Sequence, residues 1–175
     1  MPSRVNRYRR LWRHLITDHA DLRRVIGDAA LDEIEAAVQG GERRHTGEIR
    51  VAFEPALAPG AVLRRMTARE RALEVFGALR VWDTEANNGV LLYVLLADKA
   101  VEIIADRGAA RAIAQPVWDE IARDLSKAFA GGTAHQGCLA AVARLDALLA
   151  DAFALDPRAG AGRNPDELPD RPAVL

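Results

Sequence analysis

Apolar residues recur at every third or fourth position along the first 25 residues, and arginines lie between them. The apolar positions are Val5, Tyr8, Leu11, Trp12, Leu15, Ile16, Leu22 and Val25. The arginines of the first 16 residues are Arg4, Arg7, Arg9, Arg10 and Arg13. This spacing predicts a basic amphipathic helix. A second helix is expected over residues 29–38, where Asp28 can cap the start and Gly40-Gly41 ends the apolar stripe.

Over residues 48–54 the apolar positions no longer have helical spacing but alternate strictly with other residues. The apolar positions of this segment are Ile49, Val51 and Phe53, and charged residues hold most of the others. Such alternation predicts a β-strand with one face partly open to solvent. Residues 55–60 then break the chain, and Thr67 followed by Glu70 is a capping box that starts the next helix.

A polar stretch over residues 82–89 precedes the almost wholly apolar run 90–96. That run predicts a buried central strand. Residues 98–99 indicate a tight turn, so the strand expected at 100–105 pairs antiparallel with the run before it. We expect this third strand to end in a turn at residues 106–108.

The rest of the chain predicts two helices and a tail. Pro116 suits the first turn of one helix and Gly131 its end, while Thr133 can cap the other helix. Beyond residue 155, prolines and glycines predict an irregular C-terminal segment. The expected organisation is a basic N-terminal segment (1–27), an α/β domain (28–154) and an irregular tail (155–175).

Composition narrows the class of protein. At 175 residues the chain is long enough for one core, and its apolar and charged fractions of 50% and 28% are those of an ordinary globular protein. A single cysteine, Cys138, cannot form an internal disulfide, and the N-terminus lacks the continuous apolar stretch of a secretory signal. We therefore expect a cytoplasmic protein.

Topology predicts one polar cluster. If the first two strands are parallel and the third returns antiparallel, the start of the first, the loop before the second and the end of the third share one edge of the sheet. The polar residues that this arrangement gathers are Thr46, Glu48, Asp83, Glu85, Asn87, Asn88, Asp106 and Arg107. Calcium takes about six to eight oxygen ligands, and this edge offers several.

Three segments carry a family resemblance: Thr46-Gly47-Glu48-Ile49, Asn88-Gly89-Val90-Leu91-Leu92 and Val101-Glu102-Ile103-Ile104. With the order of elements they make residues 29–152 resemble the TPM domain family. The family commonly has Asp-Asn-Gly before the second strand, and here Asn87 replaces the Asp. The resemblance implies a three-layer Rossmann-like α/β sandwich with a small mixed sheet and helices on both faces. It also implies calcium binding in some members, acid phosphatase activity in others, and membrane tethering or secretion in many.

We accordingly predict Asp83, Glu85 and Asp106 as candidate metal ligands, with calcium as the candidate cofactor. The candidate ligand-binding residues are Trp82, Asn87, Asn88 and Arg107. The loop is not an EF-hand, because Asn88 stands at the glycine position and Val94 at the closing acid position. The alternative is that Asp83 and Asn87 only satisfy backbone donors in a turn.

A catalytic centre is not evident in the sequence. Cys138 and Arg144 have the spacing of a cysteine phosphatase loop, but the residues between them have the pattern of a helix interior, so we expect Cys138 in the core. The four histidines are expected at the surface: His14, His19, His45 and His135. Only His45 could reach the polar edge as a general base. We assign no catalytic residue.

Residues 4–25 admit three roles: packing on the chain's own domain, contact with a protein partner or an anionic membrane surface, and nucleic-acid binding. No recognition motif supports the last. The sequence thus favours a TPM-like binding or assembly domain of unknown ligand, possessing a candidate cation site at the polar edge. The alternative is a metal-assisted acid phosphatase that hydrolyses phosphomonoesters.

Overall fold

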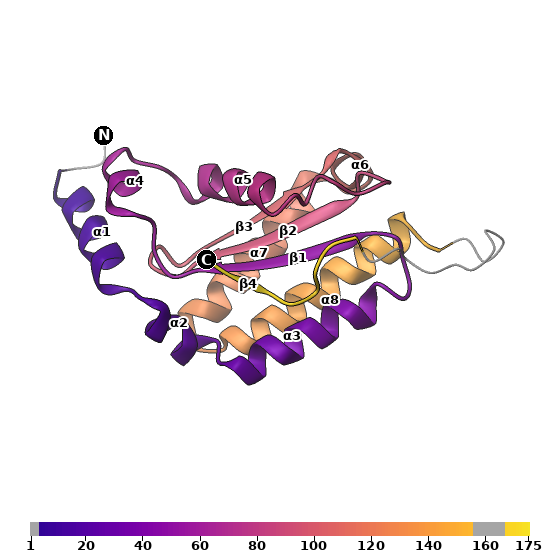
Figure 1. Cartoon of the computed structure of the whole chain (residues 1–175), viewed down its shortest axis with the longest axis horizontal. Coiled ribbons are helices and arrows are strands. Elements are labelled where there is room, and N and C mark those ends of the chain that lie inside the picture. The colour runs from indigo at the N-terminus through magenta and orange to yellow at the C-terminus, as the bar shows by residue number, and fades with distance from the viewer. Residues whose placement is uncertain (1–3, 156–166) are drawn as a thin grey trace.

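The computed structural model describes residues 4–155 and 167–175, with side chains from Arg7 onward (Figure 1). The elements in chain order are α1 (Arg4–Ile16), α2 (His19–Val25), α3 (Asp28–Gly41), β1 (Glu48–Glu54), α4 (Pro59–Leu63), α5 (Ala68–Ala78), β2 (Gly89–Leu95), β3 (Ala100–Ala105), α6 (Arg107–Ala112), α7 (Gln115–Ala130), α8 (Ala134–Ala152) and β4 (Ala173–Val174).

The described strands form one sheet in the order β3-β2-β1-β4. Strands β1 and β2 are parallel with Glu48 opposite Gly89, and β2 and β3 are antiparallel with Val90 opposite Ala105. Both pairings were predicted from the strand, crossover helix and hairpin along the chain, and both are confirmed. The start of β2 therefore lies beside the end of β3.

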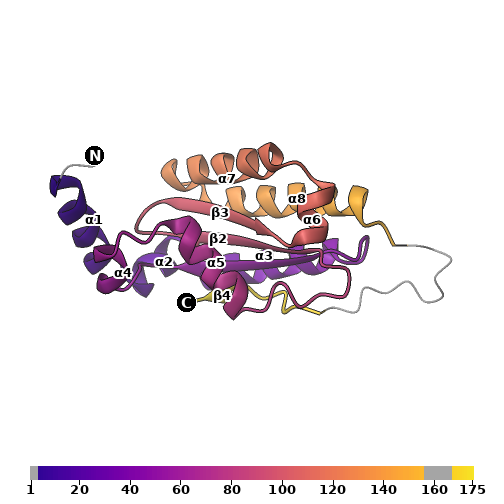
Figure 2. The ribbon, with the colours of Figure 1, turned by 90° about the horizontal axis from the view of Figure 1, so that it is seen from above.

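Helices cover both faces of this sheet. Figures 1 and 2 show α3, α7 and α8 on one side and α4 and α5 on the other. Ile49, Val51 and Phe53 enter the core beneath the first group, whereas Leu91 and Tyr93 enter the core beneath the second. The predicted α/β three-layer sandwich is confirmed. Within the two described ranges, every helix is too short or too polar to span a bilayer.

The prediction that β1 has a partly open face was wrong. All seven of its residues are buried, because helices cover one face and α5 and the C-terminus cover the other. Its charged residues therefore need partners inside the protein. Glu54 accepts a hydrogen bond from the Tyr93 hydroxyl at 2.7 Å and pairs with Arg71 at 2.9 Å. Burial and this hydrogen bond raise the pKa of Tyr93 far above its ordinary value.

Three local features differ from the predicted elements. The N-terminal segment is two helices, because Asp18 and Asp21 form a capping box that starts α2. The short helix α4 begins at Pro59, within the predicted break. The predicted turn at 106–108 is the start of α6, where the Asp106 carboxylate accepts the backbone N–H of Arg107 at 2.7 Å.

Two histidines predicted at the surface, His14 and His45, are buried. Nε2 of His45 lies 2.9 Å from Oδ1 of Asp146 on α8, and burial lowers the pKa of His45. The adjacent Thr46 donates its backbone N–H to Phe153 at 3.0 Å. These contacts join the segment before β1 to α8 and to the residue that follows it. They explain why His45 is buried, which the neighbouring sequence did not indicate.

The C-terminal segment 167–175, here called the strap, runs along the edge of β1 that is not paired with β2. Its last residues form β4, so the predicted irregular tail is corrected at 173–174; residues 156–166 of that tail lie outside the described ranges. Arg50 donates to the carbonyl oxygens of Pro169, at 2.6 Å, and Arg171. Arg171 in turn pairs with Asp32 and Glu35 of α3. The strap thus fastens β1 to α3.

The carboxyl group of Glu42 lies close to those of Glu48 and of Asp170, a residue of the strap. Glu48 accepts the backbone N–H of Leu168 at 3.2 Å. Burial, the neighbouring Glu48 carboxylate and a hydrogen bond with Asp170 raise the pKa of Glu42 to about 9. Glu42 is therefore protonated at neutral pH, which removes one negative charge from this buried group.

Replacing Glu42 by glutamine should reduce the loss of folding stability that occurs as the pH becomes alkaline. A carboxyl whose pKa is raised in the folded state stabilises the fold fully below its ordinary value of 4.5, and that contribution is lost as pH rises through about 9. From pH 6 to 9 we expect E42Q to lose less melting temperature than the wild type, by roughly 10 °C, because the wild-type carboxyl loses about 1.4 kcal/mol of stabilisation per pH unit over this range.

The measurement is thermal unfolding followed by circular dichroism at several pH values. E120Q, at an exposed glutamate of α7, is the control and should follow the wild-type curve. Parallel curves for E42Q and the wild type would contradict a raised pKa at Glu42.

Candidate functional site

The loop 82–89 and the start of α6 lie side by side at one end of the sheet, as the topology predicted. The backbone N–H of Asp106 donates to the carbonyl of Gly89 at 2.8 Å, and that of Gly108 donates to the carbonyl of Asn87 at 2.7 Å. Figure 1 shows this end of the sheet beside α6. The predicted proximity of the loop 82–89 and residues 106–108 is confirmed.

Close backbone approach explains the residue types of this loop. Asn87 has a φ of 52°, in the left-handed region that Asn tolerates better than most residues. A side chain at Gly108 would place Cβ 2.6 Å from the carbonyl oxygen of Asn87, and one at Gly89 would collide with that of Val81. The Asn-Asn-Gly sequence therefore builds a tight loop against α6.

Asn88, predicted as a ligand-binding residue, is buried and hydrogen-bonded within the protein. Its side-chain Nδ2 donates to the carbonyl oxygen of Thr46 at 2.8 Å, and its backbone N–H donates to Oγ1 of Thr84 at 3.1 Å. The amide thus joins the loop before β1 to the loop before β2. The contacts of Asn88 are therefore within the protein, and they hold the loop 82–89 in place.

An open hollow of about 270 Å³ lies between the loop and α6. It is lined by Ala86, Asn87, Arg107, Gly108 and Arg111. The Arg107 guanidinium donates to Oδ1 of Asn87, and Arg111 follows Arg107 at a spacing of four on the helix, which places both on one face. None of the described residues that line the hollow is acidic, so its side chains are electropositive.

The three predicted metal ligands have separate surroundings. Asp83 is exposed and pairs with Arg80 at 3.2 Å. Glu85 is exposed, and its backbone N–H donates to the Glu167 carboxylate at 2.9 Å. Asp106 is buried at the start of α6. Across the described parts of the chain, no three or more His, Cys, Asp or Glu side chains form a group that could hold a metal.

Of the other predicted ligand-binding residues, two line the hollow and one does not. Asn87 and Arg107 meet in the hollow as predicted, whereas Trp82 is half exposed and is not among the lining residues. Arg111 was missed, because residues 106–108 were interpreted as a turn. Arg111 follows Arg107 by four residues, a spacing that places two side chains on one face of a helix. This signal could be used only after residues 107–112 were recognised as a helix.

The cysteine and histidine considered for catalysis lie elsewhere. Cys138 is fully buried in α8, and burial raises the pKa of its thiol to about 12, so it stays protonated. Arg144 pairs with Asp124 at 3.2 Å. The His45 ring contacts Asp146 and does not line the hollow. The expectation that Cys138 belongs to the core is confirmed.

Comparison with known proteins agrees with this architecture. The family model of the TPM domain matches residues 19–148. The NMR structure of the BA42 protein from the psychrophilic bacterium Bizionia argentinensis is similar, with a TM-score of 0.71 and 26% sequence identity over 84% of this chain and 93% of that chain. Among curated proteins, none matches. Because the family model covers well over half of its length, the chain belongs to the TPM domain family.

Proposed function

We propose that the chain is a non-catalytic binding module whose ligand site is the hollow between the loop 82–89 and α6. The ligand carries an acidic group, a carboxylate or a phosphate, that the guanidiniums of Arg107 and Arg111 recognise. The observation that carries this proposal is the lining itself, in which two arginines and Asn87 meet without an acidic side chain among the described lining residues.

Arginine suits this role for a geometric reason. The planar guanidinium offers parallel N–H donors that match the two oxygens of a carboxylate or phosphate. Arg107 already donates to Oδ1 of Asn87, a contact that steadies its side chain before a ligand arrives. The loop itself is fixed by the hydrogen bonds of Asn88 and by the close approach at Gly108. A prearranged site of this kind lowers the entropy lost on binding.

Binding is favoured over hydrolysis because the hollow is lined by groups that cannot attack phosphorus. Phosphomonoester hydrolysis needs a nucleophile or a metal-held water close to the groups that bind the phosphoryl oxygens. The lining residues are alanine, asparagine, glycine and two arginines. Cys138 and His45, the other groups considered, are buried in contacts outside this lining. A metal-assisted acid phosphatase remains the alternative to be tested.

The calcium site remains a separate prediction. Asp83, Glu85 and Asp106 would have to turn toward one ion, and Arg80 and Arg107 lie among them as competing positive charges. Such a site would bind weakly, because the replacement of the family's aspartate by Asn87 removes a charged ligand. The cytoplasmic location is likewise a prediction, based on the single buried cysteine.

Inorganic phosphate should bind the hollow, and loss of Arg111 should weaken that binding by about tenfold, the effect of one charge-assisted hydrogen bond. The measurement is a titration followed by two-dimensional amide NMR. We expect saturable shifts at Asn87, Gly108 and Arg111, and a much weaker response in R111Q.

R123Q removes an exposed arginine of α7 and is the matched control, which should bind as the wild type does. Equal weakening by R111Q and R123Q would indicate general charge attraction and contradict a specific site. If phosphate shifts nothing while calcium chloride shifts the loop 82–89, the site is a cation site and the proposal is wrong.

Purified protein should not turn over an activated phosphomonoester, because no lining residue is a nucleophile. The measurement is release of nitrophenol with magnesium, manganese or calcium present. The wild type should equal an Asp83→Ala variant prepared in parallel. Metal-dependent turnover that disappears in this variant would establish the phosphatase alternative.

A further inference from the structure

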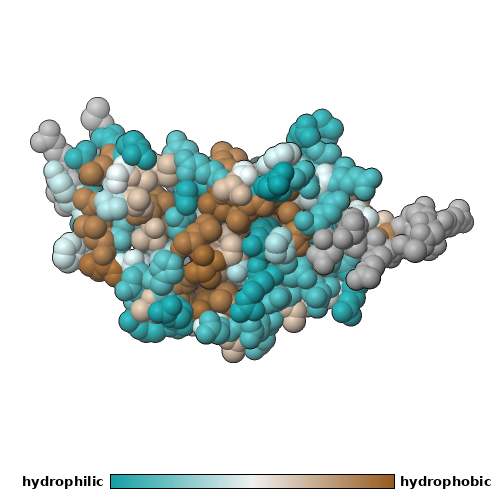
Figure 3. All heavy atoms as spheres, viewed as in Figure 1, coloured by the Kyte–Doolittle hydropathy of each residue, from teal (hydrophilic) through white to brown (hydrophobic). Residues whose placement is uncertain are grey.

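Helix α1 turns an apolar face outward. Tyr8, Trp12, Leu15 and Ile16 recur at helical spacing and are 60%, 64%, 55% and 56% exposed. Neighbouring α4, which packs beside α1, adds the half-exposed Leu63. Figure 3 shows hydrophobic side chains at the surface in this region, set among hydrophilic ones. Contiguous exposed apolar surface of this kind marks an interaction site in a soluble domain.

The inward side of α1 is held by polar contacts. His14 is buried, where its Nδ1 accepts the backbone N–H of Leu57 at 3.0 Å and its Nε2 lies 3.2 Å from Asp98 in the β2–β3 turn. Arg10 pairs with Asp98 at 2.7 Å and donates to the carbonyl of Met66 at 2.7 Å. These bonds fix the rotation of the helix, so the apolar face cannot turn inward without breaking them.

The electrostatics of Asp98 strengthen this clamp. Burial opposes ionisation of Asp98, but the hydrogen bonds from His14 and Arg10 outweigh it and hold the pKa of that carboxyl well below its usual range. Asp98 therefore stays ionised across the physiological pH range. The domain supports α1 in one orientation, with Arg10 and His14 inside and Tyr8, Trp12, Leu15 and Ile16 outside.

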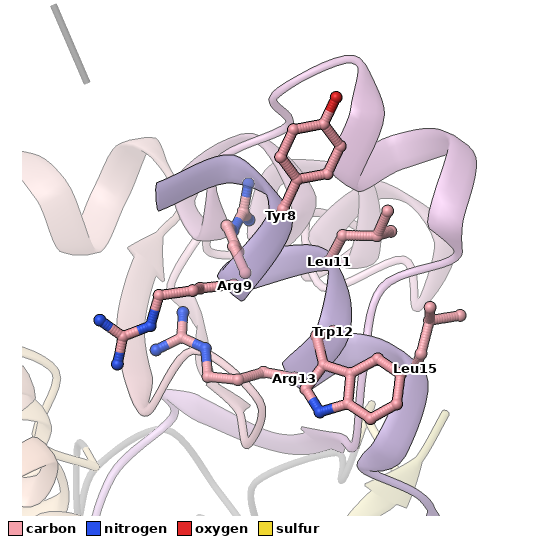
Figure 4. A pocket seen from close by; sticks show the side chains of 7 residues that line it. Tyr8, Arg9, Leu11, Trp12, Arg13 and Leu15 are labelled. Carbon is pink, nitrogen blue, oxygen red and sulfur yellow. The ribbon is translucent and has the colours of Figure 1, made fainter. Parts of the chain in front are cut away.

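Arginines border the apolar face. Arg7 and Arg9 are exposed, Arg13 is 53% exposed, and the guanidinium of Arg7 lies 5.5 Å from the centroid of the Tyr8 ring. Figure 4 shows Trp12 beside Leu15, with the Arg9 and Arg13 side chains on the other side of the helix. An open hollow of about 790 Å³ is lined by residues of α1 alone, at positions 8–13 and 15. Residues 1–27 carry seven arginines against two aspartates.

We propose that α1 binds the surface of an anionic lipid bilayer, with Tyr8, Trp12, Leu15 and Ile16 at the boundary between headgroups and acyl chains. Trp and Tyr favour that boundary because each has an apolar ring and a polar group. Arg7 and Arg9 can bury their aliphatic stems beside the apolar strip and place their charges at lipid phosphates, while Arg13 pairs with Asp98 at 3.0 Å. Charge complementarity favours this occupant over a second copy of the chain, whose identical face carries the same arginines.

The test uses the full chain with vesicles of phosphatidylcholine containing about 30 per cent phosphatidylglycerol, and with vesicles of phosphatidylcholine alone. We expect co-sedimentation with the anionic vesicles and little with the neutral ones. The double variant W12S/L15S should bind the anionic vesicles at least about tenfold more weakly, because it removes two large apolar side chains that the bilayer would bury. R7Q/R9Q should weaken binding and flatten its dependence on salt.

L73S is the control, since Leu73 on α5 is 52% exposed and removing it matches the loss of Leu15. Insertion is read separately from Trp12 fluorescence in a W82F background, because Trp118 is buried and Trp12 alone should shift to the blue on lipid binding. Circular dichroism of W12S/L15S verifies that the variant folds.

Three results would overturn the proposal. The first is absence of binding to anionic vesicles at low salt, and the second is equal binding by W12S/L15S and L73S. The third is a dimer in light scattering that W12S/L15S converts to a monomer while lipid binding is unchanged, which would make the face an interface between copies. Loss of vesicle binding would leave the phosphate titration at Arg111 unaffected, because the two surfaces share no residues.

Discussion

Burial of β1 and β2 on both faces is the constraint on which the rest of the structure depends. All seven residues of each strand are buried, yet β1 carries Glu48, Arg50 and Glu54. Burying a charge without a partner is costly, so each of these side chains needs one. Glu54 pairs with Tyr93 and Arg71, and Arg50 binds carbonyl oxygens of the strap. The faces of the sheet are therefore buried in the fold, and the two proposed binding surfaces lie at the ends of the strands.

The electropositive hollow and the apolar face of α1 lie at opposite ends of the sheet. The electropositive hollow is formed by the loop before β2, whereas α1 is clamped to Asp98 in the turn after β2. Figure 1 shows α1 and α6 at the two ends of the molecule. Attachment to a membrane through α1 would leave the hollow accessible to a ligand on the far side. The two proposals are consistent with each other, although each rests on its own residues.

Sequence pattern predicted the sheet well, because parallel and antiparallel pairing follow from connection lengths and from the turn at residues 98–99. It also predicted that the loop 82–89 meets the end of β3. It failed where tertiary contacts decide: the alternation in β1 indicated an open face, but the strap supplies partners for Arg50 that are 119 or more residues away. His45 was placed at the surface for the same reason, since Asp146 is 101 residues away.

The candidate site was predicted in location and only partly in chemistry. Asn87 and Arg107 meet as expected, but Asp106 is used as a helix cap, and Asp83 pairs with Arg80. The composition of the loop suggested a cation, because acidic residues are counted easily in a sequence. Arg111 changes that balance, and its position became evident only with the helix that carries it.

Binding of an acidic group at this end of the sheet is tested most directly by a crystal structure from crystals soaked separately in phosphate and in calcium chloride. We expect density for a phosphate between the guanidiniums of Arg107 and Arg111, and an unchanged loop in calcium. Calcium held by Asp83, Glu85 and Asp106, with no anion at the two arginines, would contradict binding of an acidic group.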